Sequence, residues 1–350
     1  MKKQSKEKIL VALSGGVDSS VAAAILKEND YDVAGAIMVF EGIPEKKIDQ
    51  AKEIAQRLDI PFYHFDFTKE FQQRVIDNFI NEYQIGRTPN PCVLCNKFIK
   101  FDLFLKKAKE LDIRKIATGH YAKIEKQDGR YLLKRGKDKN EQSYFLYRLN
   151  QKQLSKIVLP LATHTKESVR KLARKFNLPT AIRKKSQDAC FIPNGDYTSY
   201  LKKFLHPIPG PVLDKTGKVI GEHKGIFSYT YGQRRGIGIS KKTPYYVIKI
   251  DAENNTIYVG EKKDVYKSQL IATELNFIPF DTLDKPLEVM AKARYFSPLS
   301  QAKIEPFNGD KVKVIFKKVQ WALTPGQSVV FYQEDLVLGG GVIEEVEQDF

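Results

Sequence analysis

Short apolar runs alternate with helical segments over the first half of the chain, and this alternation limits the folds that the sequence can adopt. Four runs have the length and composition of buried strands: Ile9 to Leu13, Val33 to Val39, Pro61 to Phe67 and Lys115 to Thr118. Helical segments follow at Ser19 to Lys27, Glu45 to Leu58, Lys69 to Glu82, Lys97 to Leu111 and Lys166 to Phe176. Strands that alternate with helices build β–α–β units. The sequence therefore predicts an α/β N-terminal domain with a mostly parallel sheet.

The pattern changes after about residue 205. The segment His206 to Pro211 alternates prolines with other residues and predicts a linker rather than a helix or a central strand. Beyond it, short strands with turn residues between them predict a small mostly-β central domain and then a C-terminal β-barrel. We expect a catalytic domain at 1–204, a central domain at 205–268 and the barrel at 269–350.

Lysine and arginine outnumber acidic residues by 58 to 42, which gives a net charge of +16. Such an excess favours a polyanionic partner, most often nucleic acid, although a lysine-rich proteome would produce the same composition. No apolar run approaches the ~20 residues of a membrane helix, and no signal-peptide pattern precedes the first predicted strand. We therefore expect a cytoplasmic protein without membrane contact. Its three cysteines argue against a secreted disulfide framework.

The strongest motif lies between the first predicted strand and helix and reads SGGVDSS, residues 14–20. Glycines let backbone N–H groups converge on an anion, and the start of a helix adds positive potential. The motif is neither a Walker A loop nor a G-x-G-x-x-G. Asp18 is placed to share a Mg²⁺ ion with a bound phosphate. Met38 and Gly119 end two other predicted strands, where parallel sheets bind ligands, so both could contact an adenosine; core packing is the alternative for Met38.

Cys92 and Cys95 form a C-x-x-C in a proline-rich loop, and Cys190 lies far downstream. We expect Cys95 to lie near the start of the Lys97 helix, where the helix end and neighbouring lysines would lower the pKa of its thiol. Two chemistries fit three cysteines: sulfur transfer through a persulfide and a disulfide, or a 4Fe–4S cluster with one open position. Zinc lacks a fourth ligand at ordinary spacing. A chance arrangement of inert thiols is the remaining alternative.

These motifs together resemble a known family. SGGVDSS is similar to the pyrophosphate-binding loop of the ATP-pyrophosphatase superfamily. With TPNPCVLCNKFIKFD, ATGHYAKI, EQSYFL, SQDACFI, KARY and TPGQSVVFY in this order, the chain resembles the bacterial tRNA-specific 2-thiouridylase family over essentially its full length. The resemblance implies that ATP adenylates the C2 oxygen of the wobble uridine (position 34) of tRNA. A cysteine persulfide then supplies sulfur, and AMP and pyrophosphate are released.

The resemblance also implies roles for individual residues. Cys190 matches the persulfide-carrying cysteine, Cys95 matches the cysteine that attacks or resolves, and Asp18 would act at the ATP site and on Mg²⁺. The implied nucleotide contacts are Ala12, Leu13, Ser14, Gly15, Gly16, Val17, Asp18, Ser19, Met38 and Gly119. The implied tRNA contacts are Asn90, Pro91, Cys92, His120, Asn140, Glu141, Gln142, Arg294, Tyr295 and Gln327. Other members can have an aspartate in place of Cys92, which leaves a structural or cluster-ligand role open for this residue.

The implied partners are tRNAs for lysine, glutamate and glutamine, together with a sulfur carrier or a cysteine desulfurase, and we expect a monomer. Three basic runs would bind RNA phosphates, although such runs are usually only solvated: Arg183-Lys184-Lys185, Arg234-Arg235 and Lys241-Lys242. Two other interpretations stay open. One is an ATP-pyrophosphatase that acts on a small metabolite, and the other is an iron–sulfur or RNA-binding scaffold without activity.

Overall fold

The computed structural model describes residues 6–179, 189–239 and 243–347. The chain divides into two compact units. Unit 1 comprises Met1–Val75, Cys92–Phe191 and Asp335–Val337, and unit 2 comprises Ile76–Pro91, Ile192–Glu334 and Leu338–Phe350. No helix within the described ranges is long and apolar enough to cross a membrane. The three domain limits expected from the sequence stay a prediction.

Unit 1 contains a five-stranded sheet in the order β3-β2-β1-β4-β7, in which neighbouring strands pair in parallel. Its strands are β1 (Lys8–Ala12), β2 (Asp32–Val39), β3 (Phe62–Asp66), β4 (Lys115–Ala117) and β7 (Ile157–Val158). β1 pairs with β2 on one side and β4 on the other, and its residues from Ile9 onward are buried. This is why the run is continuously apolar instead of alternating. The predicted parallel sheet is confirmed.

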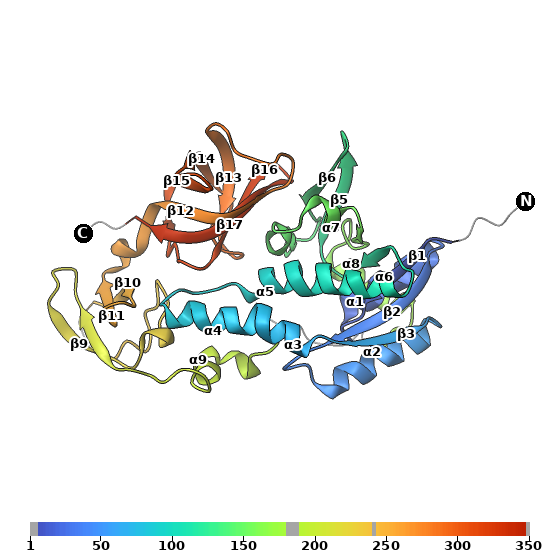
Figure 1. The fold of residues 1–350 in the computed structure, drawn as a ribbon, viewed down its shortest axis with the longest axis horizontal. Coiled ribbons are helices and arrows are strands. Elements are labelled where there is room, and N and C mark those ends of the chain that lie inside the picture. Colours follow the sequence, from blue (N-terminus) through green and yellow to red (C-terminus); the bar gives the residue numbers. More distant parts are fainter. Residues whose placement is uncertain (1–5, 180–188, 240–242, 348–350) are drawn as a thin grey trace, which may run out of the picture. The chain divides into compact units, whose positions relative to one another are not determined.

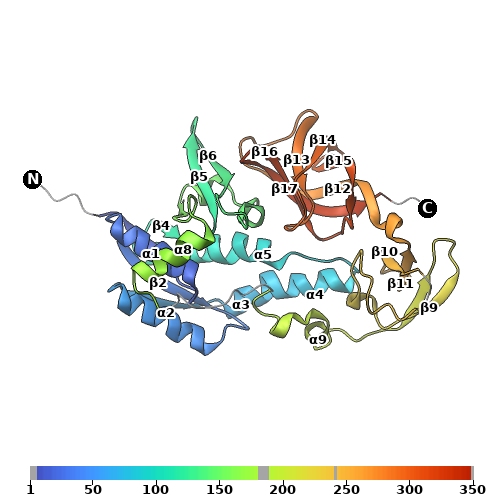
Figure 2. The ribbon, with the colours of Figure 1, turned by 180° about the vertical axis from the view of Figure 1, so that it is seen from behind.

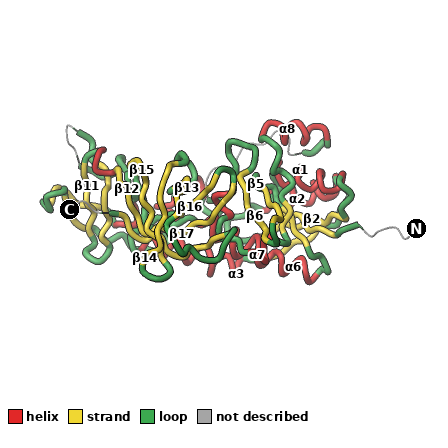
Figure 3. The backbone as a smooth tube through the Cα atoms, turned by 90° about the horizontal axis from the view of Figure 1, so that it is seen from above, coloured by secondary structure: helices red, strands yellow, loops and turns green. Residues whose placement is uncertain are grey.

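Helices cover both faces of this sheet. α1 (Val17–Glu28) and α2 (Glu45–Arg57) share one apolar core with β1, β2 and Phe62 of β3. Phe65 of β3 points to the opposite face, because strand side chains alternate, and its ring meets Phe104 of α6 (Phe104–Glu110). Figure 1 shows α2 and α6 on the two sides of the sheet, and Figure 3 shows α1 beside α2 and α8 (Lys166–Lys175).

Two long helices contain π-helical stretches, in which hydrogen bonds span five residues instead of four. The first consists of α3 (Thr68–Phe71), the π segment η1 (Gln72–Ile76) and α4 (Asp77–Gln84). The second consists of α5 (Pro91–Leu94), the π segment η2 (Cys95–Leu103) and α6. The second helix was predicted to begin at Lys97 but begins at Pro91, since proline is well tolerated at the first helical position.

The rest of unit 1 follows the local signals in the sequence. Asp128 and Gly129 form the tight turn between β5 (Ala122–Gln127) and β6 (Arg130–Arg135), as an Asp-Gly pair between two strands favours. Thr165 caps α8 in a capping box with Ser168, as its position before the helix predicts. Short helical segments complete the unit at η3 (Ser143–Leu146) and α7 (Gln151–Leu154).

Unit 2 is mostly β (Figure 2), as predicted. A four-stranded sheet has the order β10-β11-β8-β9, from β8 (Gly210–Leu213), β9 (Val219–His223), β10 (Tyr246–Asp251) and β11 (Thr256–Gly260). The linker prediction is wrong at its end, because Gly210 and Pro211 already belong to β8. Pro211 is tolerated there since the pairing of β8 with β11 begins only at Val212.

The other strands form an antiparallel ring in the order β12-β15-β14-β13-β16-β17, which β12 and β17 close by pairing with each other, so the predicted barrel is confirmed. Its strands are β12 (Tyr266–Phe277), β13 (Leu287–Lys292), β14 (Ser300–Phe307), β15 (Lys311–Trp321), β16 (Ser328–Gln333) and β17 (Leu336–Val346). The short helices of this unit, besides α4, are η4 (Pro193–Gly195), α9 (Tyr197–Leu201), η5 (Ile226–Ser228) and η6 (Lys262–Val265).

Candidate functional site

The SGGVDSS motif lies where β1 ends and α1 begins. Gly15 has a φ of +71°, and a Cβ there would lie 3.1 Å from both a side-chain and a backbone atom of α2. Gly16 is the N-cap of α1, and no side chain caps this helix end. The N–H of Ser14 donates to the hydroxyl of Ser19 at 3.1 Å. A tight glycine turn therefore precedes the helix, and no side chain caps the N–H groups of its first turn. Such an arrangement is suited to binding an anion.

A second segment presses on this loop from the carboxyl end of β4. A Cβ on Gly119 would lie 2.7 Å from the carbonyl carbon of Asp18 and 2.7 Å from the backbone nitrogen of Ser19, so only glycine fits. The structure thus brings Gly119 and the loop together at one edge of the sheet. Met38 is half-buried near the carboxyl end of β2, where it pairs with Phe65 of β3.

Both carboxylate oxygens of Asp18 have partners. The hydroxyl of Tyr121 donates to Oδ1 at 2.7 Å, and the ammonium of Lys166 pairs with Oδ2. The same ammonium lies over the Tyr121 ring, 5.3 Å from its centroid. Neither Lys166 nor Tyr121 was among the predicted site residues. Tyr121 directly follows the Gly119-His120 pair that comes after β4, which is the one local signal that could have pointed to it.

One carboxylate beside a phosphate-binding turn fits a magnesium ion that is held mainly by nucleotide phosphates and water. Asp18 is the residue that would share such an ion. Among the residues that the structure describes, however, no three His, Cys, Asp or Glu side chains gather closely enough to hold a metal. Cys92, Cys95 and Cys190 are all described, so their placement does not fit the alternative of a 4Fe–4S cluster.

The C-x-x-C lies inside a helix instead of before one. α5 already covers Cys92, and Cys95 opens η2. Burial raises the pKa of the Cys95 thiol to about 12, and the attraction of Lys100 opposes this only in part. The predicted lowering of this pKa is therefore wrong, because the helix starts six residues earlier and the loss of water around the sulfur outweighs the nearby positive charge.

The π-helical register of η2 determines which side chain lies beside Cys95. Residues five apart lie about one turn apart in such a segment, whereas in an α-helix they point to different sides. Lys100 stands five residues after Cys95 and interacts electrostatically with Cys95, Cys92 and Cys190. Burial lowers the pKa of Lys100, but these interactions outweigh it and leave the pKa raised. Lys100 therefore lies within electrostatic range of all three sulfur atoms.

Cys190 is exposed and stands next to a firmly packed residue. The side chain of Phe191 is 3% exposed, and its ring meets Phe71 edge-on with the ring centroids 5.7 Å apart. Gly42 approaches this segment so closely that a Cβ there would lie 2.6 Å from the Cα of Phe191. Although the residue as a whole is exposed, neighbouring atoms exclude water from part of its sulfur; this desolvation raises the pKa of the Cys190 thiol, and nearby lysines oppose the shift.

His120 follows Gly119 and lies in the same unit. Its Nδ1 is 2.7 Å from the hydroxyl of Thr118, and its ring centroid is 5.6 Å from that of Phe101. Burial, with a smaller contribution from the charge of Lys100, lowers the pKa of His120 to about 3. The ring is therefore neutral at physiological pH and suits a hydrogen-bonding role better than an acidic one.

The segment 140–142, which the family resemblance marks as a tRNA contact, is tied into unit 1. Glu141 is 3% exposed, and its carboxylate accepts hydrogen bonds from Arg135 at 3.2 Å and from a backbone N–H at 2.8 Å. Gln142 and Tyr121 exchange two hydrogen bonds, at 3.1 and 2.8 Å. The Glu141 side chain faces the interior, so an RNA contact at this position would have to come from the backbone.

Other predicted tRNA contacts lie in unit 2. Nε2 of Gln327 donates to the carbonyl oxygens of Thr88 and Pro89 at 2.9 and 3.1 Å. Gln327 therefore holds the segment that leads directly to Asn90 and Pro91. The structure brings these predicted residues together although they are far apart in sequence.

Arg294 and Tyr295 follow β13 in the barrel. The guanidinium of Arg294 donates to the carbonyl oxygen of Tyr231 at 3.3 Å and contacts the hydroxyl of Thr324. The ring of Tyr295 meets Phe296, which is 90% exposed, with centroids 4.8 Å apart. Of the predicted basic runs, Arg234-Arg235 is exposed, and Arg183-Lys184-Lys185 and Lys241-Lys242 lie outside the described residues.

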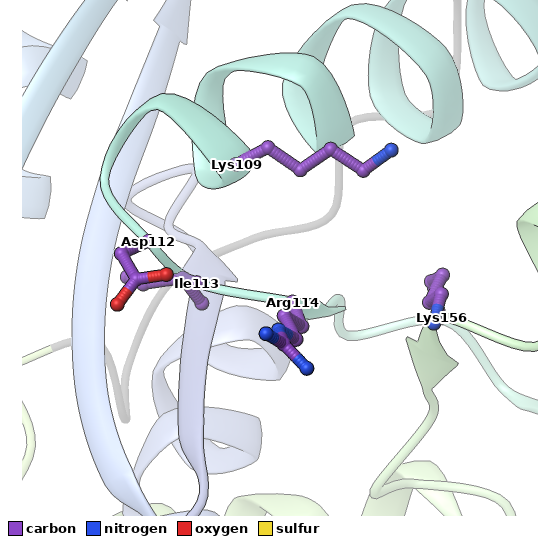
Figure 4. A pocket seen from close by; sticks show the side chains of 5 residues that line it. All are labelled: Lys109, Asp112, Ile113, Arg114 and Lys156. Carbon is purple, nitrogen blue, oxygen red and sulfur yellow. The ribbon is translucent and has the colours of Figure 1, made fainter.

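A basic hollow of about 360 Å³ lies elsewhere in unit 1, lined by Lys109, Asp112, Ile113, Arg114 and Lys156 (Figure 4). Residues 113 and 114 precede β4, and Lys156 precedes β7. The hollow therefore lies at the amino ends of these parallel strands, whereas the glycine turn lies at the carboxyl end of β1. Ligands of parallel sheets bind at the carboxyl ends, so this hollow is not part of the candidate site.

Three family models cover nearly the whole chain. One described as the tRNA methyl transferase HUP domain matches residues 7–194. The tRNA methyl transferase PRC-barrel domain matches 198–261, and the aminomethyltransferase beta-barrel domain matches 267–343. The first is a nucleotide-binding type of fold, in agreement with the glycine turn at the end of β1.

Curated relatives match over almost their full length. The "tRNA-specific 2-thiouridylase MnmA" of Halothermothrix orenii is 47% identical, with 97% of this chain and 99% of that protein covered. The protein of the same name from Caldicellulosiruptor saccharolyticus is 49% identical with the same coverage. Among solved structures, the U34-tRNA thiolase NcsA from Methanococcus maripaludis with its 4Fe–4S cluster covers 58% of this chain and 68% of its own. Its 21% identity and TM-score of 0.36 are too low to carry an argument.

Proposed function

We propose, because this chain belongs to the tRNA-specific 2-thiouridylase family, that it replaces the C2 oxygen of the wobble uridine (position 34) of tRNA with sulfur in an ATP-dependent reaction. Thiolation of a tRNA uridine is the activity of the family. The adenylation step, the persulfide and the choice of uridine are the parts that we propose for this chain.

One observation carries the proposal: the glycine turn and the three cysteines belong to the same compact unit. Cys190 lies within electrostatic range of Cys92 and Cys95, although a long stretch of chain separates them. A thiolase needs a nucleotide-activating site and two cooperating thiols within reach of one base. A protein that used the loop alone would have no need to keep three thiols within electrostatic range of one lysine.

In the first step, the C2 oxygen of uridine attacks the α-phosphorus of ATP. An O–P bond forms, the bond between the α and β phosphates breaks, and pyrophosphate leaves. The turn at Ser14 to Gly16 and the start of α1 would hold the departing phosphates through backbone N–H groups. The carbon then carries AMP as a leaving group, which turns a poor electrophile into a good one. A magnesium ion shared with Asp18 would neutralise part of the phosphate charge.

In the second step, the terminal sulfur of a Cys190 persulfide attacks C2, the C2–O bond breaks, and AMP leaves with the former uridine oxygen. The thiolate of Cys95 then attacks Sγ of Cys190. The S–S bond to the base breaks, 2-thiouridine departs, and a Cys95–Cys190 disulfide remains. A thiol reductant from the cell must reduce this disulfide, and a sulfur donor must restore the persulfide.

Reconstitution with a tRNA transcript, ATP and a persulfide donor tests this mechanism. We expect 2-thiouridine by mass spectrometry and pyrophosphate release that requires the tRNA. Cys190→Ser and Cys95→Ser should each abolish 2-thiouridine while pyrophosphate release continues, since adenylation precedes sulfur transfer. A transcript with cytidine at position 34 is the matched control and should give neither product.

Two results would contradict the proposal. Thiolation that survives both cysteine substitutions would overturn the sulfur relay. Pyrophosphate release that a small metabolite stimulates as well as tRNA does would favour an ATP-pyrophosphatase of free metabolites. The proposal also includes tRNAs for lysine, glutamate and glutamine as substrates, a sulfur carrier or cysteine desulfurase as donor, a monomeric state, and domain limits at 204/205 and 268/269.

A further inference from the structure

Lys166 and Asp18 form an ion pair at the start of the helix that follows the glycine turn. Their side chains are 24% and 30% exposed, so the pair is neither freely solvated nor closed off from a ligand. Tyr121 holds the second carboxylate oxygen and lies under the Lys166 ammonium. A carboxylate and a cation in contact therefore stand beside the backbone groups that we expect to meet phosphate.

The turn itself contributes no positive side chain. Residues 12–20 contain no Lys, Arg or His and one acid, Asp18. The phosphates of ATP carry several negative charges, which a carboxylate at the same helix end repels. In P-loop proteins a lysine within the loop supplies the compensating charge, but the SGGVDSS motif has none. Lys166 reaches the loop from a helix 148 residues away in sequence.

The backbone of Lys166 is fixed while its side chain can move. Lys166 is the first residue of α8, and its N–H donates at 2.6 Å to Oδ2 of Asp138, which is 6% exposed. Thr165 caps the same helix end through the N–H of Ser168. The long stem of a lysine can turn through several bonds about such an anchor. The ammonium can therefore leave Asp18 without any movement of α8.

We propose that Lys166 is a further nucleotide-binding residue, whose ammonium exchanges its contact with Asp18 for an oxygen of the ATP phosphate chain. The inference rests on the proposed use of ATP. The exchange places a positive charge on the phosphates and releases a carboxylate oxygen that can share the magnesium ion of the nucleotide. Without nucleotide, the ion pair with Asp18 keeps the Lys166 ammonium at the site and offsets part of the free-energy cost of removing it from water.

Nucleotide binding to the full chain tests this role without any turnover. The probes are the α,β-methylene analogue of ATP, which cannot be split between these phosphates, and adenosine, each titrated by calorimetry in magnesium buffer. Loss of one charge-assisted contact predicts binding of the analogue about 10- to 100-fold weaker in Lys166→Met, with adenosine binding unchanged. Lys166→Arg keeps the charge and should recover most of the affinity.

Lys171→Met is the matched control, because Lys171 lies on the same helix with its side chain 72% exposed and forms an ion pair with Glu167. It should bind both probes as the unsubstituted protein does. Equal analogue affinity in Lys166→Met would overturn the inference and leave the ATP proposal intact. A parallel loss of adenosine and analogue would also overturn it, since Lys166 would then support the fold. Failure of the unsubstituted protein to bind the analogue would refute the proposed ATP use itself.

Discussion

The resting state of Cys95 can be measured through its exchange with a small disulfide. A thiol with a pKa of about 12 is deprotonated in about one molecule in 10⁴ at pH 8, against about one in 10 for the ordinary value of 9.0. The thiolate of the weaker acid is more nucleophilic, by about 0.45 log units per pKa unit, which recovers about 20-fold of the ~1000-fold loss. We therefore expect Cys95 to react about 50-fold more slowly at pH 8 than an unhindered thiol.

The assay uses the full chain with Cys92→Ser and Cys190→Ser, so that Cys95 is the one thiol left, and follows the absorbance of a released aromatic thiol. Steric shielding also slows the reaction, but it does not change the pH dependence. The rate should rise about tenfold per pH unit from 7 to 9.5 without levelling off. A rate that levels off below pH 9 would refute the argument that burial sets the pKa of this thiol.

Lys100→Met in the same background tests the electrostatic part of the argument. Burial sets the raised pKa of Cys95, and Lys100 opposes it. Removal of the ammonium should therefore raise the pKa further and slow the exchange at every pH. Lys97→Met, at a neighbouring lysine that is not among the groups that shift this pKa, is the matched control. A faster reaction in Lys100→Met would show that the π-helical register does not place this cation beside the sulfur.

Three further changes test other parts of unit 1. Gly119→Ala places a methyl group 2.7 Å from the backbone of the glycine turn, so the unfolding free energy in urea should fall by about 1–3 kcal/mol. His120, with a pKa of about 3, should stay neutral in an NMR titration from pH 7 to 5. Because the unfolded ring gains a proton near pH 6.5 and the folded ring does not, the unfolding free energy should fall by up to about 2 kcal/mol over this range. Phe191→Ala removes a buried ring that packs on Phe71; it should cost about 3 kcal/mol in urea and speed alkylation of Cys190, measured by mass spectrometry.

The parallel sheet was predictable because its central strand shows its burial in its composition. Ile9 to Leu13 has no polar residue to place on a solvent face, and the strand has neighbours on both sides. The hairpin at Asp128-Gly129 was predictable because few residue pairs turn so tightly. The π-helical segments were not predictable, since an apolar pattern over two turns does not separate a four-residue from a five-residue hydrogen-bond spacing, and packing decides between them.

The candidate site was likewise predictable from the sequence only in part. Gly119 was expected near the loop because the carboxyl ends of parallel strands meet at one edge, and its contact with Asp18 follows from that rule. Lys166 was missed because no local pattern relates it to residue 18. Its place depends on how α8 packs against α1, which share an apolar core, and that contact is set by tertiary structure. The pKa of Cys95 was missed for a similar reason, because burial is a property of the folded unit and not of the residues next to the cysteine.

The two cysteines of the proposed relay differ in their exposure to solvent, and this difference suits an ordered reaction. At pH 7.5, deprotonation of a thiol with a pKa of about 12 costs about 6 kcal/mol, so Cys95 reacts slowly in the resting protein. Cys190 is exposed, so a sulfur donor can reach it first. A persulfide on Cys190 is therefore protected from premature attack by Cys95. Cys95 acts faster once a change at the site lowers its pKa, and a bound, adenylated tRNA is the event that the proposed mechanism supplies. The measurement that decides this is the Cys95 exchange rate with tRNA and the ATP analogue present. An unchanged rate would mean that Cys95 is not the resolving thiol.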